Sequence, residues 1–159
     1  MGVITWIENT GLAEMVRISA YGYPVMITLH SLGLAIMVGL SVLLSLRVLG
    51  LFRTIPYSTL QRLLKIAWIG FIINFASGGS LFSANATGFI ADWVFLAKMS
   101  MVIVGAILVG TMQGMIRTAL ASGNPEATAG AGIRIVAGLA IVAWGLGMVF
   151  GRLVPYLPP

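Results

Sequence analysis

The single histidine of this 159-residue chain lies inside an apolar segment long enough to span a membrane. His30 belongs to the run from Tyr21 to Leu46, and no charged residue occurs between Arg17 and Arg47. An imidazole can carry a proton, relay one or bind a metal, and at membrane depth it costs free energy unless it has a partner. His30 is therefore the first candidate for a functional site.

The helix neighbours of His30 suggest which ligand it could hold. Met26, Gly33 and Met37 lie three, four or seven positions away and share its helix face. Gly33 removes a side chain beside the imidazole, where a flat macrocycle such as haem b could approach. Met26 and Met37 could add thioether ligands, which suit copper. The spacing predicts haem ligation by His30 or a copper site, and an interhelical hydrogen bond is the alternative without a ligand.

A row of small and polar residues in the second apolar segment could face His30. Gly70, Asn74 and Gly78 recur every four residues, a spacing typical of helix interfaces in membranes. If Asn74 faces His30, its amide could fix the imidazole tautomer. Asn74 is therefore both a packing residue and a candidate site residue.

Two basic residues could neutralise the acidic groups of a cofactor. Lys98 lies one turn into the third apolar segment, where it could also extend to the lipid headgroups or pair with Asp92. Arg17 precedes the first segment and could reach a haem propionate there. Asp92 itself is expected to cap the helix that follows it or to face water.

Composition places the chain in the membrane class. It is 59% hydrophobic and 8% charged, whereas soluble domains have about 25% charged residues. The few bases mostly flank apolar runs, so they indicate membrane orientation and not nucleic-acid binding. The chain has no cysteine, which excludes disulfides and thiolate metal sites within it. It lacks a Gly-rich phosphate loop, a zinc-protease motif and a nucleophile elbow, and its start does not resemble a signal peptide.

The pattern predicts an all-α fold, an integral membrane four-helix bundle preceded by a short amphipathic interfacial helix, as a single domain over 1–159. The interfacial helix is expected over about 3–17, with Asn9 and Thr10 as caps or a break within it. The spans are expected over about 21–46, 57–82, 94–116 and 133–150. Asn124-Pro125-Glu126 is expected to break the chain between the last two spans, and the proline-rich end at 155–159 to stop the last helix.

The distribution of bases predicts the orientation. Six bases lie on one side of the predicted spans, namely Arg47, Arg53, Arg62, Lys65, Arg117 and Arg134, and three on the other, namely Arg17, Lys98 and Arg152. The richer side should be cytoplasmic. Both termini and the loop 83–93 would then face the periplasm from a bacterial inner membrane. His30 would lie roughly 13 Å below that surface, in the outer half of the bilayer.

Three stretches of sequence occur together: Tyr23-Pro24-x5-His30-x2-Gly33, Leu46-Arg47-x-Leu49-Gly50-Leu51, and Trp68-x-Gly70-Phe71 followed by Gly78-x2-Leu81-Phe82 and Phe95-x2-Lys98. This combination, over about residues 5–117, resembles a bacterial family of small four-helix integral membrane proteins of unknown function. It is also loosely similar to the membrane domain of copper-resistance D proteins and to small b-type cytochromes. The resemblance implies that His30, Arg47 and Lys98 belong to the family pattern. Three of the four histidines usual in b-type cytochromes are missing, which argues against a two-haem electron wire.

These observations predict a small membrane haem protein with His30 as axial ligand. Its role would be electron transfer with quinone or a periplasmic redox partner, or redox or gas sensing. A copper, proton or ion pathway and an accessory subunit of a larger membrane complex are the alternatives. The Gly-x-x-x-Gly pairs at Gly110 and Gly114 and at Gly147 and Gly151 predict close helix contacts and favour a homo-oligomer in the lipid bilayer.

Overall fold

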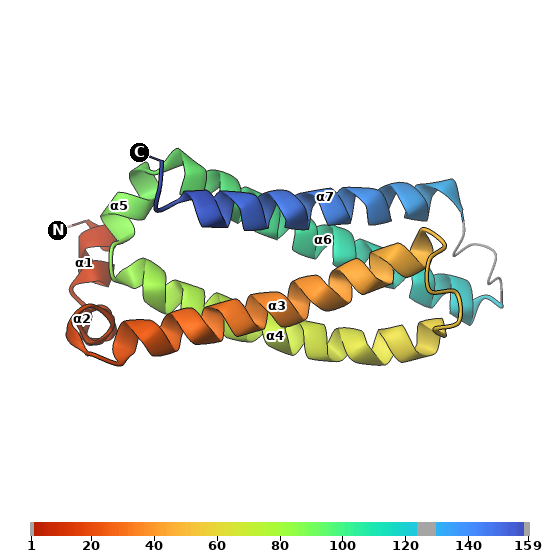
Figure 1. The fold of residues 1–159 in the computed structure, drawn as a ribbon, viewed down its shortest axis with the longest axis horizontal. Coiled ribbons are helices and arrows are strands. Elements are labelled where there is room, and N and C mark those ends of the chain that lie inside the picture. The colour runs from red at the N-terminus through yellow and green to blue at the C-terminus, as the bar shows by residue number, and fades with distance from the viewer. Residues whose placement is uncertain (1, 124–129, 158–159) are drawn as a thin grey trace.

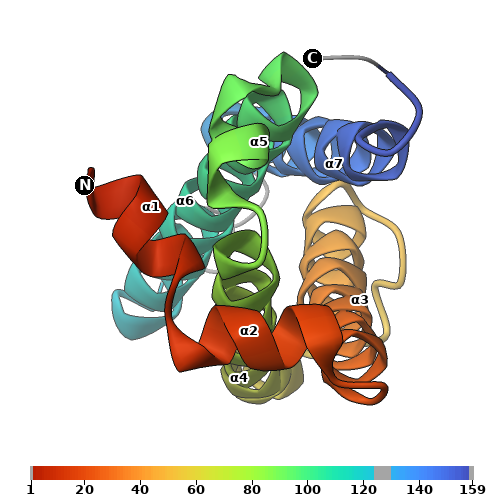
Figure 2. The same ribbon diagram turned by 90° about the vertical axis from the view of Figure 1, so that its left-hand side faces the viewer.

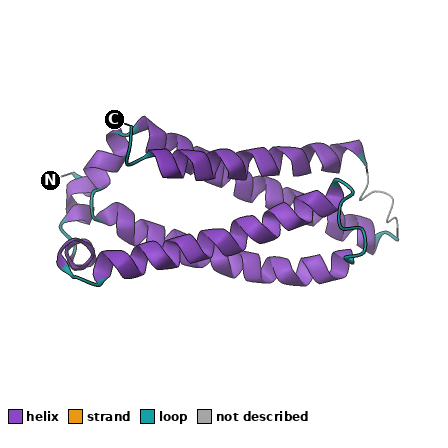
Figure 3. Ribbon diagram, in the orientation of Figure 1, coloured by secondary structure: helices purple, strands orange, loops and turns teal. Residues whose placement is uncertain are grey.

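The computed structural model of the protein describes residues 2–123 and 130–157. Within these residues the chain forms helices and no strand (Figure 3). The helices, in chain order, are α1 (Val3–Glu8), α2 (Gly11–Ile18), α3 (Gly22–Val48), α4 (Tyr57–Ser83), α5 (Ala86–Ala91), α6 (Trp93–Ala121) and α7 (Ala131–Leu153). The predicted all-α bundle with a short helical segment before it is confirmed.

Four of these helices are long and apolar enough to cross a membrane. They are α3, α4, α6 and α7, with 23 to 29 residues and mean hydropathies between 1.4 and 2.1 over their most apolar windows. Their bounds agree with the predicted spans to within five residues at each end. Large apolar side chains on their outward faces, such as Ile72, Phe75 and Ile107, are more than half exposed. Such a surface suits lipid and not water.

The four long helices form two antiparallel hairpins. α3 packs along α4, α6 packs along α7, and the most extensive contact between the hairpins joins α3 to α7 (Figure 1). The N-terminal helices α1 and α2, the short α5 and the C-terminal end of α7 lie at one end of the bundle, here called the terminal end (Figure 2). The α3–α4 loop and the start of α7 lie at the other end, here called the loop end.

The apolar core occupies only the half of the bundle near the loop end, here called the loop half. It is built from α3 beyond residue 36, α4 up to residue 67, α6 beyond residue 107 and α7 up to residue 144. Its buried members are Met37, Val38, Leu44, Val48, Leu60, Leu64, Ala67, Val109, Met112, Ile116, Ile133, Ala137, Ala140 and Trp144. The remaining parts of these helices form the terminal half.

The predicted interfacial helix is two helices. Thr10 separates α1 from α2, because its side chain accepts a hydrogen bond from the Ala13 N–H and so caps α2. Asn9 ends α1. The predicted break at these two residues is thus confirmed.

The short helix α5 was not predicted. Its first turn is hydrogen-bonded to a side chain of α1. The Glu8 carboxylate accepts hydrogen bonds from both the backbone N–H (2.8 Å) and the hydroxyl of Thr87. These bonds from Thr87 lower the pKa of Glu8 below its usual value. Because the carboxylate comes from a residue 79 positions earlier in the chain, local sequence could not reveal it.

Basic residues order the loop end. Arg47 donates from Nε to the Ile55 carbonyl (2.9 Å), and its guanidinium lies over the Tyr57 ring at 4.4 Å. Arg134 donates to the Leu49 carbonyl at 3.3 Å. The predicted break at Asn124-Pro125-Glu126 lies outside the described residues, as do the last two prolines of the predicted tail.

Candidate functional site

His30 lies against α4, where two helix backbones approach closely. A Cβ atom added at Gly33 would lie 2.5 Å from the Gly70 carbonyl oxygen and 2.7 Å from the Asn74 nitrogen. No residue larger than glycine fits this contact without a backbone shift. The close approach brings the side chains of His30 and Asn74 within hydrogen-bonding distance of the opposite helix.

His30 and Asn74 bind each other reciprocally. His30 Nδ1 lies 2.9 Å from the Asn74 carbonyl oxygen, and Asn74 Nδ2 donates to the His30 carbonyl oxygen at 2.8 Å. Each contact joins a side chain of one helix to the backbone of the other. Asn74 therefore faces His30, the arrangement that the sequence left open.

These distances assign the imidazole tautomer. A carbonyl oxygen only accepts hydrogen bonds, so the Asn74 carbonyl requires a proton on Nδ1. Asn74 Nδ2 also lies 3.2 Å from Nδ1, but its shorter bond to the His30 carbonyl satisfies it without Nδ1 as acceptor. We therefore place the neutral imidazole proton on Nδ1, which leaves the lone pair on Nε2. Within the described part of the chain, Nε2 has no hydrogen-bond partner.

Gly78 makes room for the imidazole ring one turn beyond Asn74. A Cβ atom at Gly78 would lie 2.9 Å from His30 Cε1 and 3.0 Å from Nδ1. Gly70, Asn74 and Gly78, which recur every four residues, thus form the strip of α4 on which α3 packs. The sequence pattern predicted a helix interface at this row, and this is confirmed.

The space expected beside Gly33 is not open. The backbone of α4, at Gly70 and Asn74, fills it. The glycine is needed for the contact between the two helices, and no macrocycle can approach α3 at that position. The prediction that haem approaches α3 at Gly33 is therefore wrong. A small residue in a membrane-spanning helix also lets a second helix come close, and here α4 takes up that space.

Lys98 turns toward the interior of the terminal half. It is partly buried on α6, and its aliphatic chain covers Gly151 of α7, where an added Cβ would lie 3.3 Å from Lys98 Cε. Lys98 therefore packs between α6 and α7 in the terminal half.

Asp92 does not pair with Lys98 but caps α6. Its carboxylate accepts hydrogen bonds from the Val94 N–H at 2.8 Å and the Phe95 N–H at 3.4 Å, and the residue is 7% exposed. The predicted capping role is confirmed.

The other predicted site residues lie in different surroundings. Arg17 donates to the Glu8 carbonyl (2.7 Å) and so joins α2 to α1. Met37 is fully buried in the core of the loop half, whereas Met26 is partly exposed one turn before His30. The described residues contain no group of three or more histidines, cysteines or carboxylates that could hold a metal ion. The copper site stays a prediction.

A second polar cluster lies in the loop half and was not predicted. Trp68 donates from Nε1 to Gln113 Oε1 at 3.1 Å, and Gln61 donates from Nε2 to the Gln113 carbonyl at 3.3 Å. These bonds join α4 to α6. The signal in the sequence was the presence of one glutamine in each of two membrane-spanning helices, where polar side chains usually bond between helices.

The glycine pair on α7 serves contacts within one chain. Gly147 packs on Met101 and Val102 of α6, and Gly151 lies under Lys98. On α6, Gly110 lies near Trp68, and Gly114 faces open space. The predicted close helix contact is present between α6 and α7, and the homo-oligomer stays a prediction.

Comparison of the chain with protein-family models, curated proteins and solved structures finds no match.

Proposed function

We propose that this protein binds haem b in the terminal half of the bundle, with His30 Nε2 as an axial ligand. One observation carries the proposal: the Asn74 carbonyl holds Nδ1–H, and Nε2 keeps its lone pair. Histidines that ligate a metal almost always donate their other ring N–H to a carbonyl or carboxylate in this way. The reciprocal bond from Asn74 to the His30 backbone fixes the ring further.

Two features of the terminal half support the proposal. Lys98 is a partly buried cation there, and it could neutralise a propionate. In the spanning helices of this half, Val94 is the one fully buried large aliphatic side chain among the described residues.

Bound haem would supply a one-electron redox centre or a site for a small gas. The residues of this chain orient one imidazole, hold its proton on Nδ1 and place a cation in the same half of the bundle. Because the chain has one histidine, iron would be five-coordinate or take a second ligand from a methionine or from a second copy of the chain. By the base count, this site would lie in the periplasmic half of a bacterial inner membrane, where quinone or a periplasmic protein could exchange electrons with it.

The test is an absorption spectrum of the detergent-purified protein loaded with haem, oxidised and then reduced by dithionite. We expect a Soret band with sharpened visible bands on reduction, and its loss or shift in His30→Ala. Ser31→Ala is the matched control, since Ser31 is the exposed neighbour on the same helix. A helical protein that binds no haem overturns the proposal. Copper retained by the same sample, and lost in His30→Ala, would assign His30 to the copper alternative.

A further inference from the structure

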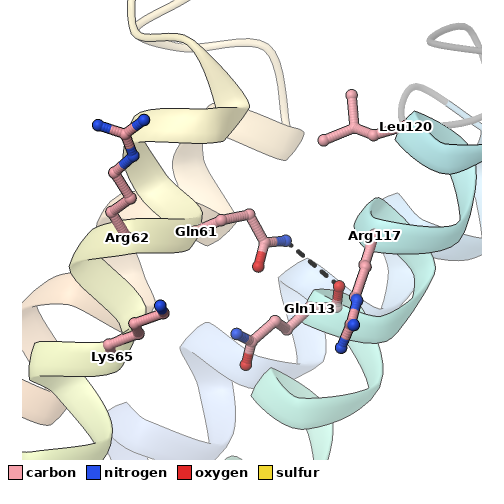
Figure 4. Close-up of a pocket in the computed structure, with 6 residues that line it drawn as sticks. All are labelled: Gln61, Arg62, Lys65, Gln113, Arg117 and Leu120. Atoms are coloured by element: carbon pink, nitrogen blue, oxygen red, sulfur yellow. Dashed lines mark hydrogen bonds between the residues drawn. The ribbon is translucent and has the colours of Figure 1, made fainter.

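A cavity lies between α4 and α6 in the loop half, away from His30. Its volume is about 520 Å³, and it is lined by Gln61, Arg62, Lys65, Gln113, Arg117 and Leu120 (Figure 4). Three of these six residues are cations, and none is an acid. A cavity of this size accommodates a headgroup or a small molecule.

The hydrogen bonds around Gln113 make the cavity rich in donors. An indole N–H only donates, so the amide group of Gln113 must turn its oxygen toward Trp68. Its NH2 group is thereby turned to the opening, on the side of Lys65 (Figure 4). The amide nitrogen of Gln61 donates to the backbone carbonyl of Gln113. The Gln113 amide therefore offers N–H donors beside the cations.

The cations approach the opening from both helices. Figure 4 shows Lys65 on the α4 side and Arg117 on the α6 side of the bridge between Gln61 and Gln113, with Arg62 pointing toward the start of α4. Among the described acids, Glu8, Glu14 and Asp92 all belong to the terminal end. Glu126 lies outside the described residues, in the connector that follows α6.

We infer that this cavity binds the phosphodiester headgroup of an anionic phospholipid. Ammonium, guanidinium and amide N–H groups are the donors that bind phosphate oxygens. Basic pockets between membrane-spanning helices, near the helix ends, are typical sites for anionic headgroups. Leu120 and the exposed apolar faces of the helices adjoin the cavity, so acyl chains attached to the phosphate can stay in lipid. A free phosphate would share the headgroup chemistry but not this apolar contact.

The experiment uses Trp68 as a local reporter and the full chain without added haem. In a Trp6→Phe/Trp93→Phe/Trp144→Phe background, which leaves Trp68 as the one tryptophan, the protein is placed in nanodiscs of phosphatidylcholine or of equal parts phosphatidylcholine and phosphatidylglycerol. In the mixed discs, either lipid is replaced stepwise by its analogue brominated on the acyl chains, which quenches nearby tryptophan; the pure phosphatidylcholine discs give the quenching without an anionic lipid. We expect brominated phosphatidylglycerol to quench Trp68 at several-fold lower mole fraction than brominated phosphatidylcholine.

Two double variants separate a site from a charged surface. Lys65→Gln/Arg117→Gln removes cations from the cavity and should lower the preference about fivefold for each cation removed. Arg53→Gln/Arg134→Gln removes two charges from the same end of the bundle, where both side chains approach Gly50 outside the cavity. It should keep the preference. Circular dichroism checks that both variants stay helical, and neither pair contacts His30.

Several results would overturn the inference. Equal quenching by the two lipids, or equal loss in both double variants, would leave only a general surface charge. Displacement of phosphatidylglycerol by inorganic phosphate at concentrations that leave the bulk lipid charge unchanged would assign the cavity to a soluble anion. If the preference for phosphatidylglycerol appeared only in Glu126→Gln, the Glu126 carboxylate, and not a lipid, would be the anion that the cavity cations bind. Because haem is absent throughout, failure here is distinct from failure of the proposed function.

Discussion

The two halves of the bundle are built by different means. The loop half is closed by large apolar side chains, including Leu44, Leu64 and Met112, all of which are fully buried. The terminal half buries glycines and polar groups at its α3–α4 contact, where Gly33 meets Gly70 and Asn74. One half is therefore held by side-chain packing, and the other by close backbone contact and reciprocal hydrogen bonds.

This difference separates the part of the bundle that stabilises the fold from the part that contains the candidate site. In lipid, apolar side chains gain little from burial beyond van der Waals contact, so dense packing is what stabilises the loop half. The terminal half gives up part of that packing and keeps a histidine and an asparagine in contact, with a partly buried lysine in the same half. Polar groups at membrane depth are costly and are typical of functional sites. The loop half supports the fold while the terminal half carries the candidate chemistry.

The largest expected effect breaks the packing of the loop half. Leu64→Ala should lower the free energy of unfolding by about 3 kcal/mol, since it leaves a cavity in a filled core. Ile72→Ala on the lipid-facing side of the same helix should cost about 0.5 kcal/mol or less. Sodium dodecyl sulfate titration in mixed micelles measures both. Equal costs for the two variants would contradict the division between the halves.

The next effect breaks the backbone contact of the terminal half. Gly33→Ala should cost about 2 kcal/mol, because the added methyl group must push α4 away. Gly39→Ala on the same helix meets nothing within 4 Å and should stabilise the helix by about 0.5 kcal/mol. The same titration compares them. A neutral Gly33→Ala would mean that the α3–α4 contact is looser than described.

A smaller effect separates the two roles of Asn74. Asn74→Ala removes the amide that donates to the His30 carbonyl but keeps the backbone carbonyl that accepts from Nδ1. We expect a cost of about 1 kcal/mol and a haem spectrum that survives, in contrast to His30→Ala. Ser80→Ala, whose hydroxyl bonds only within its own helix, is the control. A spectrum lost in Asn74→Ala would show that the amide, and not the carbonyl, orients the ring.

The smallest effect concerns the contact between α1 and α5. The hydrogen bonds from Thr87 lower the pKa of Glu8 below 4.5, its ordinary value. This contribution to stability is present above the unfolded pKa and is lost as the pH falls through the folded pKa. We expect hydrogen exchange at the Thr87 amide, corrected for intrinsic rates, to accelerate at acid pH. Glu8→Gln should remove this pH dependence and Glu14→Gln should not.

Much of the fold could be predicted because hydropathy and helix length are local properties. The bounds of the four long helices follow from runs of apolar residues, and Thr10 and Asp92 are recognisable caps. Helix α5 has six residues and no apolar period of its own. It depends on Glu8, a partner far away in sequence, so composition alone could not reveal it.

The candidate site was only partly predictable for a similar reason. A row of glycines around Asn74 marks a helix interface, and it led correctly to the facing of Asn74 and His30. The same reasoning failed at Gly33, because the sequence does not distinguish a glycine that makes room for a ligand from one that makes room for a second helix. The bases Arg62, Lys65 and Arg117 fit the topology rule individually, and only the position of α4 opposite α6, joined by the hydrogen bonds of Gln113, brings them to one cavity.

The hydrogen bonds between Glu8 and Thr87 also bear on the order in which the chain can be assembled. Helix α1 is synthesised before α3 and α4, yet the group that binds its carboxylate follows α4. The first hairpin can enter the bilayer before that group exists, since α3 and α4 pack mainly on each other. The contact between α1 and α5 can therefore form only after the first hairpin is complete and α5 has emerged behind it.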